Sequence, residues 1–228
     1  MTEAGAGAGT GFRSLMRASH ATVGPALLRY WRITVEGRDH VPATGGVILA
    51  ANHRSFADHY TLGAASPRPM RFLGKAELAQ GLTGRFNLAM GMIPVERGSA
   101  DLAALDVVIN HLRDGAVIGI FPEGTRSPTG QLFRFRSGMA RVAAAAKVPI
   151  VPVGMIGMDH VWPRGADRPI LGRPDPGVVS ITFAAPIVLA DDSPRARRGA
   201  TAAVFDQVAA LCRQPLADGF ARIPEREG

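Results

Sequence analysis

Residues 47–58 read VILAANHRSFAD, an unbroken apolar run that passes at once into a polar turn. A short apolar run bounded by turn residues is typical of a strand that is buried on both faces of a parallel sheet. Open α/β sheets hold their ligands beyond the carboxyl ends of such strands. The stretch therefore predicts an α/β fold in which His53, at the end of the strand, lies at the ligand-binding edge.

The alternation of strand and helix continues in both directions from this stretch. Short runs of β-branched residues alternate with longer Ala- and Leu-rich runs, which indicates a single α/β domain with a mostly parallel, mixed central sheet flanked by helices. The expected strands cover residues 32–36, 47–51, 71–73, 92–95, 117–121, 150–153 and 178–183. The expected helices cover residues 58–65, 82–89, 100–113, 138–146 and part of 197–213.

The N-terminal segment differs from the rest of the chain. Residues 1–11 are rich in Ala and Gly and predict a mobile tail. Residues 12–31 mix apolar side chains with arginines, and Gly24-Pro25 is expected to divide them into two short amphipathic helices. A basic pair of this kind can lie in the headgroup region of an anionic membrane, so we expect it to face a membrane. The alternative is a helical hairpin that docks on the protein's own core.

Residues 162–177 form a second unusual segment, rich in Pro, Gly and Arg. The segment is too long for an ordinary connection, so we expect a surface loop that is either functional or a tolerated insertion. No uninterrupted apolar run reaches the roughly 18 residues that a membrane-spanning helix needs.

The composition narrows the class of protein further. Of 228 residues, 46% are hydrophobic and 20% are charged, which excludes a disordered or fibrous chain. Cys212 is the one cysteine, which excludes a disulfide framework and a multi-cysteine zinc site. The net charge is +7, and all but two of the 26 Lys and Arg residues are arginine. This excess favours phosphate-bearing partners, although a nucleotide bias of the genome would also produce it.

His53 and Asp58 are the first candidates for chemistry. Asp58 lies at the expected start of a helix, where its carboxylate can fold back and accept the Nδ1–H of His53. This contact would leave Nε2 free to take a proton, as base and orienter do in hydrolase triads. The alternative is a polar turn in which Asp58 only caps the helix.

A second polar turn follows the expected strand at 117–121. In the sequence FPEGTRS, Gly124 permits a close backbone approach, Thr125 offers a hydroxyl and Arg126 can bind a phosphate through two hydrogen bonds. Glu123 can orient a cationic partner. A turn without a ligand would seldom need this combination, so the turn predicts a binding site.

Two further cations follow expected strands. Arg97 ends the stretch GMIPVER, and Lys75 stands at the end of the preceding strand. Both can contact an anionic ligand at this edge, while a solvated surface position is the alternative for Arg97. No Gly-x-Ser-x-Gly elbow, P-loop or dinucleotide-binding glycine motif occurs, and Cys212 lies far from these segments, so a covalent enzyme intermediate is not indicated.

Four of these segments occur together in the order and at the spacings of a known family. They are NHRSFAD at residues 52–58, the block at 91–97, FPEGTRS at 121–127 and the apolar stretch at 148–153. Over about residues 47–157 the chain resembles the 1-acylglycerol-3-phosphate acyltransferases of the glycerolipid acyltransferase superfamily. The joint occurrence of NHRSFAD and FPEGTRS makes this resemblance highly specific, and it implies an acyltransferase domain over residues 32–228.

The resemblance also implies a role for each motif. His53 would match the family's catalytic histidine and Asp58 its partner in the HxxxxD motif. The acceptor and its phosphate would be bound by Lys75, Arg97, Glu123, Gly124, Thr125 and Arg126. The stretch at 148–153 would border the acyl chain.

Members of the family transfer a fatty acyl group from a coenzyme A or acyl-carrier-protein thioester to a lysophospholipid hydroxyl, without a metal or other cofactor. The resemblance therefore implies that 1-acylglycerol-3-phosphate becomes phosphatidic acid at an anionic membrane surface, on the cytoplasmic face, with acyl carrier protein as a further candidate partner and no nucleic acid. The chain is compact and lacks the membrane-spanning helices of many relatives, so another lysolipid or glycerol position is the alternative.

Two other interpretations stay open from the residues alone. His53, Asp58 and His59 could gather a metal ion for hydrolysis, although the remaining histidines are scattered. The basic balance would also permit a non-enzymatic protein that binds lipid or nucleic acid. Aromatic residues make up only 6% of the chain, and they are not interleaved with basic residues as base stacking would require.

Overall fold

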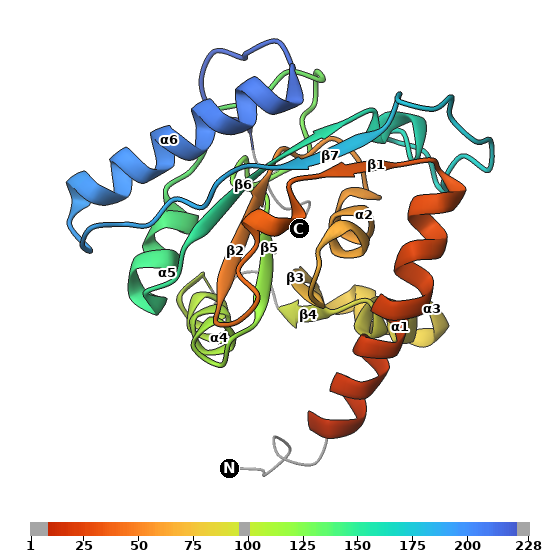
Figure 1. Ribbon diagram of the computed structural model, residues 1–228, viewed down its shortest axis with the longest axis horizontal. Helices are drawn as coiled ribbons and strands as arrows, with labels where there is room; N and C mark the ends of the chain where they lie inside the picture. The colour runs from red at the N-terminus through yellow and green to blue at the C-terminus, as the bar shows by residue number, and fades with distance from the viewer. Residues whose placement is uncertain (1–8, 96–100, 223–228) are drawn as a thin grey trace.

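The computed structural model describes residues 9–95 and 101–222 and shows a layered α/β domain (Figure 1). Across these residues seven strands form one sheet in the order β1-β7-β6-β2-β5-β3-β4. The strands are β1 (Thr34–Glu36), β2 (Val47–Ala51), β3 (Met70–Lys75), β4 (Met92–Val95), β5 (Val117–Ile120), β6 (Ile150–Ile156) and β7 (Ser180–Phe183). Neighbours from β6 across to β4 are all parallel, whereas β7 runs antiparallel to β6 and pairs in parallel with β1. The expected mostly parallel, mixed sheet is confirmed.

Helices cover both faces of this sheet. They are α1 (Gly9–Tyr30), α2 (Asp58–Ala65), α3 (Gly81–Ala89), α4 (Asp101–Arg113), α5 (Gly138–Ala146) and α6 (Pro194–Cys212), with short 3-10 helices η1 (Arg38–His40), η2 (Ala76–Ala79) and η3 (Met158–His160). Figure 1 shows α4, α5 and α6 on one side of the strands and α1, α2 and α3 on the other. The sheet is therefore buried between two helical layers.

β2 lies at the centre of the sheet, between β6 and β5, and all of its residues are buried. Val47, Leu49 and Ala51 pack into the core that α1 and α2 help to form. Ile48 and Ala50 pack into the core shared with α4, α5 and α6. Successive side chains of a strand alternate between the two faces, so a strand covered on both faces must be apolar at every position. This explains the unbroken apolar run, which ends where His53 leaves the sheet.

Several elements begin or end elsewhere than expected, for reasons that involve the rest of the fold. β6 continues to Ile156 because its last residues pair with β7. β1 begins only at Thr34, since Arg32 has a φ of 50° in the left-handed region and cannot be part of the strand. α6 begins at Pro194, where the hydroxyl of Ser193 accepts the N–H of Ala196 and caps the helix.

The N-terminal helix corrects one expectation. α1 is a single helix that continues through Pro25, not two helices divided at Gly24-Pro25. Packing on α2 accounts for this, because a Cβ atom on Gly24 would lie 3.4 Å from the Ala64 Cα, which shows how closely the two helices approach. The ring of His20 also bonds the Ser66 carbonyl at 2.9 Å. These contacts hold the helix together across a residue that normally interrupts one.

This packing uses the apolar side of the N-terminal segment. Met16 is buried, and Leu28 and Trp31 pack against the core. Between residues 14 and 31 the exposed large apolar side chains are Leu15 and Tyr30. The segment is therefore docked on the protein's own core, as in the second interpretation, but as one helix and not as a hairpin. Residues 1–8 of the expected tail lie outside the described residues, and no helix in the described part of the chain is long and apolar enough to cross a bilayer.

Candidate active site

The turn after β2 is fixed to the neighbouring strand before it reaches His53. Asn52 Nδ2 donates to the Met155 carbonyl of β6 at 2.9 Å and to Gln214 Oε1 at 2.7 Å. Asn52 Oδ1 accepts the Met155 N–H at 2.8 Å. Because Asn52 is buried, these bonds compensate for the loss of water around its amide. The chain therefore leaves the sheet in a defined direction.

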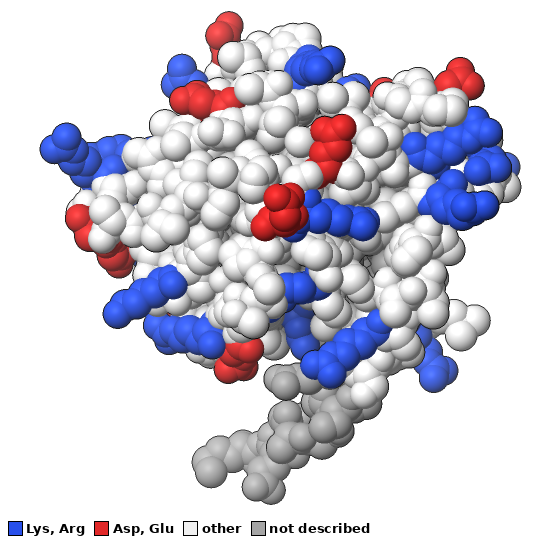
Figure 2. All heavy atoms as spheres, in the orientation of Figure 1, with Lys and Arg blue, Asp and Glu red and all other residues white. Residues whose placement is uncertain are grey.

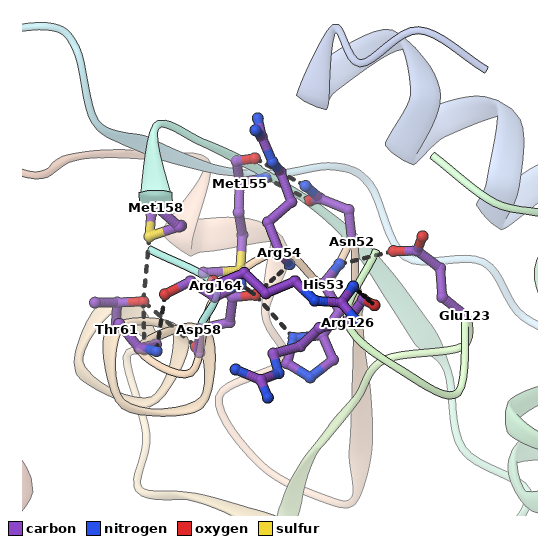
Figure 3. A network of polar contacts seen from close by, with 12 residues as sticks. Asn52, His53, Arg54, Asp58, Thr61, Glu123, Arg126, Met155, Met158 and Arg164 are labelled. Atoms are coloured by element: carbon purple, nitrogen blue, oxygen red, sulfur yellow. Dashed lines mark hydrogen bonds and ion pairs between the residues drawn. The ribbon is translucent and has the colours of Figure 1, made fainter. Parts of the chain in front are cut away.

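His53 and Asp58 contact each other as expected. His53 Nδ1 lies 2.8 Å from Asp58 Oδ2, and the same oxygen accepts the backbone N–H groups of Arg54 at 2.7 Å and Ser55 at 2.8 Å (Figure 3). Asp58 is the first residue of α2, and its carboxylate folds back toward the turn and not along the helix. Three donors on one oxygen hold the carboxylate in place, and the carboxylate holds the imidazole with Nε2 on its far side.

Aromatic side chains surround the ring of His53. Phe121 stacks on it with a centroid distance of 4.1 Å and an interplanar angle of 21°, and His59 meets it edge-on at 5.1 Å. Only 10% of the His53 side chain is exposed. A nearly dry environment strengthens the hydrogen bond to Asp58 and restricts the ring to one orientation. The ring is therefore almost fully enclosed, with a small part of the side chain open to solvent.

His59 is held as a neutral group. Its ring lies 4.8 Å from that of Phe72 and 4.7 Å from that of Phe121. Burial, and after it the neighbouring His53, lower the pKa of His59 to about 3, so its imidazole carries no charge near pH 7. Within the described residues no group of three or more His, Cys, Asp or Glu side chains is placed to hold a metal ion.

Glu123 corrects another expectation, because its carboxylate does not face a substrate. It is fully buried, with Oε1 accepting the N–H of His53 at 2.8 Å and Oε2 the N–H of Phe133 at 3.0 Å. The N–H of Ser127 donates to the His53 carbonyl at 2.8 Å, so this turn binds both polar groups of the His53 backbone. Burial is the main cause that raises the pKa of Glu123 to about 7. Glu123 is therefore bonded to the His53 backbone, and its buried carboxylate is not exposed to an acceptor.

The same turn brings a cation to the histidine. Figure 3 shows the side chain of Arg126, which is partly buried, on the same side as the His53 ring. The Arg126 carbonyl accepts Arg164 Nη1 at 2.8 Å, which fixes the turn from outside. Gly124 stands exposed at the tip with a φ of 80°, a conformation that glycine adopts at little cost, and Thr125 follows it. The fold therefore unites the two polar turns around one side chain.

Lys75 is less closely placed than Arg126. Lys75 is exposed at the end of β3 and lies at the same edge as His53, because β3, β5 and β2 are parallel. Two strand positions separate β3 from β2, which amounts to roughly 10 Å. Arg97 lies outside the described residues.

Sequence reasoning left Asn52, Ser55 and Phe121 without a role, although they stand inside the two motifs. Ser55 Oγ donates to the Trp162 carbonyl at 2.6 Å and accepts the Ala57 N–H at 3.0 Å. Their position beside His53 and Glu123 was a signal. Apart from the Ala57 N–H, the partners named here lie far away in the sequence, so no local pattern identifies these contacts.

Comparisons with known proteins concern the same region of the chain. The family model described as Acyltransferase matches residues 32–156. The chloroplastic 1-acyl-sn-glycerol-3-phosphate acyltransferase of Arabidopsis thaliana is 30% identical over 142 residues, which cover 60% of this chain and 40% of that protein. The 1-acyl-sn-glycerol-3-phosphate acyltransferase of Bacillus subtilis is 29% identical over 147 residues, 62% of this chain and 73% of that protein. The chain thus spans less than half the length of the Arabidopsis relative.

A solved structure extends the likeness to the fold. The 1-acyl-sn-glycerophosphate acyltransferase PlsC of Thermotoga maritima superposes with a TM-score of 0.67 at 23% identity, covering 88% of this chain and 81% of that one. The two chains therefore share a fold. Residues 32–156, which the family model matches, make up more than half of this chain and contain both polar turns around His53. The chain belongs to the acyltransferase family, a family of enzymes.

Proposed function

We propose that the protein transfers a fatty acyl group from an acyl-coenzyme A or acyl-carrier-protein thioester to the free hydroxyl of a lysophospholipid. The acceptor is 1-acylglycerol-3-phosphate, which becomes phosphatidic acid. The observation that carries the proposal is the 2.8 Å contact between His53 Nδ1 and Asp58 Oδ2 at the carboxyl edge of the sheet. Family membership supports the class of reaction, and the names of the Arabidopsis and Bacillus relatives support this acceptor.

In this mechanism His53 is the general base. With Nδ1–H bonded to Asp58, the lone pair of Nε2 accepts the proton of the acceptor hydroxyl as its oxygen attacks the thioester carbonyl. Asp58 stabilises the imidazolium that forms. The tetrahedral intermediate then expels the thiolate, which takes the proton back from Nε2, so His53 ends in the form in which it began. A positioned base of this kind typically contributes about 10²–10⁴-fold to the rate.

The thioester places few other demands on the protein. It is already activated, so a base and correct orientation suffice without a covalent enzyme intermediate, a metal or another cofactor. The oxyanion of the tetrahedral intermediate needs N–H donors, and we assign this task to backbone N–H groups near the turn at residues 52–58.

The phosphate of the acceptor calls for cations at the same edge. Arg126 is the first candidate, because its guanidinium lies on the same side as the His53 ring and can bind two phosphate oxygens at once (Figure 3). Gly124 and Thr125 precede it in the same turn, and Lys75 stands at the end of β3 on the same edge of the sheet. Arg97 is a further candidate, from the sequence alone. Glu123 acts on the acceptor only through the backbone of His53.

We place the reaction at the cytoplasmic face of a membrane, with the protein bound peripherally. The acceptor and the product both partition into lipid, whereas the thioester donors are water-soluble carriers. The acyl chain of the acceptor can therefore remain in the bilayer while its hydroxyl reaches His53.

A panel of substrates tests the proposal. Purified protein is incubated with lysolipids that differ in headgroup and in the acylated carbon, together with a labelled acyl thioester of coenzyme A or acyl carrier protein, and the products are identified by mass spectrometry. We expect phosphatidic acid from 1-acylglycerol-3-phosphate, its loss in His53→Ala and its retention in Arg198→Ala, a change of an exposed residue on α6. If only another lysolipid gave a product, that lysolipid would replace 1-acylglycerol-3-phosphate as the proposed acceptor. No product from any pair would contradict acyl transfer.

A further inference from the structure

The loop at residues 162–177, here called the arginine loop, is held against the C-terminal end of α1. Arg173 donates to two carbonyls at that end, to Tyr30 from Nε at 3.0 Å and to Arg29 from Nη2 at 3.3 Å. The Tyr30 hydroxyl donates to the Leu171 carbonyl, and Trp31 Nε1 donates to the Ile170 carbonyl at 3.1 Å. These bonds join segments about 140 residues apart in sequence, so the loop presents a defined surface.

Large apolar side chains stand on the outside of this loop. Leu171 is 73% exposed and Ile170 is 42% exposed, while the adjoining Tyr30 is 40% exposed. The carbonyls of both loop residues accept hydrogen bonds from Tyr30, the last residue of α1, and from Trp31, which follows it, and these bonds keep the two neighbours at the surface. Adjacent apolar side chains rimmed by polar ones are typical of a surface that binds something.

The rim around this apolar tip is basic. Arginines lie on both the loop and the end of α1, and Figure 2 shows Lys and Arg side chains gathered at the edge of the molecule where Figure 1 draws the loop. The exposed arginines are Arg29, Arg32, Arg164, Arg168 and Arg173. The acidic residues of the loop are Asp167 and Asp175, so the positive charges are in the majority.

The arginine loop is also connected to both turns of the candidate active site. Its first residue, Trp162, accepts a hydrogen bond from Ser55 Oγ at 2.6 Å, and its ring lies 4.9 Å from that of Phe56. Arg164 Nη1 donates to the Arg126 carbonyl at 2.8 Å. Whatever binds the loop is therefore held close to the edge at which His53 lies.

We propose that this surface docks the protein on an anionic lipid bilayer. Ile170 and Leu171 enter the headgroup layer, and the arginines around them bind lipid phosphates. The layering of the patch, an apolar tip within a basic rim, matches a bilayer, in which apolar chains lie beneath anionic headgroups. The link between this docking surface and the reaction rests on the proposed function, because a lipid acceptor could then reach His53 from the membrane. The docking itself does not require turnover.

Vesicle sedimentation tests the docking without turnover. Full-length protein is mixed with vesicles of phosphatidylcholine alone or with phosphatidylglycerol added, and the bound fraction is measured. We expect Leu171→Asp to weaken binding to the anionic vesicles about tenfold, since it removes an apolar contact and adds a repelled charge. Val188→Asp is the matched control, because Val188 is 74% exposed but lies far from the loop. Its neighbour Ile187 forms a β-bridge with Ile150, the first residue of β6, at the end of the strand away from His53.

A second pair of variants tests the charges. Arg168→Glu should weaken binding to the anionic vesicles several-fold and leave the weak binding to phosphatidylcholine unchanged, whereas Arg198→Glu on α6 should behave as the unaltered protein. Equal binding by Leu171→Asp and Val188→Asp would overturn the proposal. So would variants that bind vesicles normally but lose binding to acyl carrier protein, because the surface would then recognise a protein.

The outcome is separable from that of the proposed function. If the docking pattern holds but no lysolipid is acylated, the docking surface stands and the proposed reaction falls. If a short-chain, water-soluble acceptor is acylated equally by Leu171→Asp and the unaltered protein while vesicle binding is also equal, the reaction stands and the docking surface falls.

Discussion

The two polar turns of the site each bury one carboxylate, but they use it differently. In the turn after β2, Asp58 Oδ2 binds the side chain of His53 and two backbone N–H groups, while Oδ1 has no hydrogen-bond partner among the described residues. In the turn after β5, Glu123 gives one oxygen to the backbone of His53 and the other to that of Phe133. Asp58 therefore orients the ring, and Glu123 fixes the backbone that carries it.

This difference teaches that one histidine is positioned by two independent constraints. A carboxylate on the ring can act on proton transfer directly, because it stabilises the charge that the ring gains. A carboxylate on the backbone can act only through position and stability. Changes at Asp58 and Glu123 should therefore alter different measurable quantities, although both carboxylates lie within hydrogen-bond distance of His53.

The largest expected effect is on acyl transfer, in variants of His53 and of Asp58, the carboxylate that orients its ring. His53→Ala and Asp58→Ala should each lower acyl transfer by about 10²–10⁴-fold, since one removes the base and the other its orientation. Circular dichroism should show an intact fold for both. Asp58→Ala should also unfold more easily, because the buried N–H groups of Arg54 and Ser55 lose their acceptor, at a cost of about 1–3 kcal/mol each. Near-normal turnover of His53→Ala would remove the basis of the mechanism.

A smaller effect is expected on acceptor binding. Arg126→Ala should raise the KM for the lysolipid about ten- to a hundredfold, the equivalent of losing a hydrogen bond to a charged group, and should change kcat much less. Steady-state kinetics with each substrate varied in turn provide the measurement. A change confined to kcat would instead assign Arg126 to the reacting atoms and not to the phosphate.

Glu123, the carboxylate bonded to the His53 backbone, should affect how the free energy of unfolding depends on pH. Burial raises the pKa of Glu123 from an ordinary 4.5 to about 7, so the folded protein binds this proton more tightly than the unfolded chain. The resulting stabilisation is complete below pH 4.5 and is lost as the pH rises through 7, by up to about 3 kcal/mol. Chemical denaturation of the unaltered protein and of Glu123→Gln at several pH values measures it. The same slope in both proteins would show that Glu123 is not its source.

The smallest effect is expected at His59. Its pKa of about 3 keeps the ring neutral at working pH, and its ring packs among aromatic rings, with one hydrogen bond to the Phe56 backbone that a phenylalanine would lose, so His59→Phe should preserve turnover within a few-fold. The pH dependence of turnover between pH 5 and 9 should be unchanged as well. A loss comparable to that of His53→Ala would mean that both histidines take part in the reaction.

Contacts between residues close in sequence were predictable. The His53–Asp58 contact spans five residues, and the apolar run of β2 directly before it shows where in the sheet the pair would lie. The contacts of Glu123 were not, because its partner His53 lies 70 residues away, and a glutamate in a turn looks the same whether it faces water or a backbone N–H. Asn52 shows the same limit, since Gln214 lies 162 residues away.

In the N-terminal segment a local sequence signal was misleading. Pro25 is a local signal for a break, and the residues around it are amphipathic, but the helix continues because α2 packs closely at Gly24. Local preference was outweighed by tertiary contact, whose free energy depends on which surface lies opposite.

By itself the sequence determined the α/β architecture, the central strand and the histidine–carboxylate pair, since periodicity and short spacing act within a few residues. Only the tertiary structure decided that Glu123 supports the backbone, that α1 is one docked helix and that residues 162–177 join α1 to the active-site edge. These features depend on hydrogen bonds and packing between segments far apart in the chain, and such contacts form only after the sheet has brought those segments together.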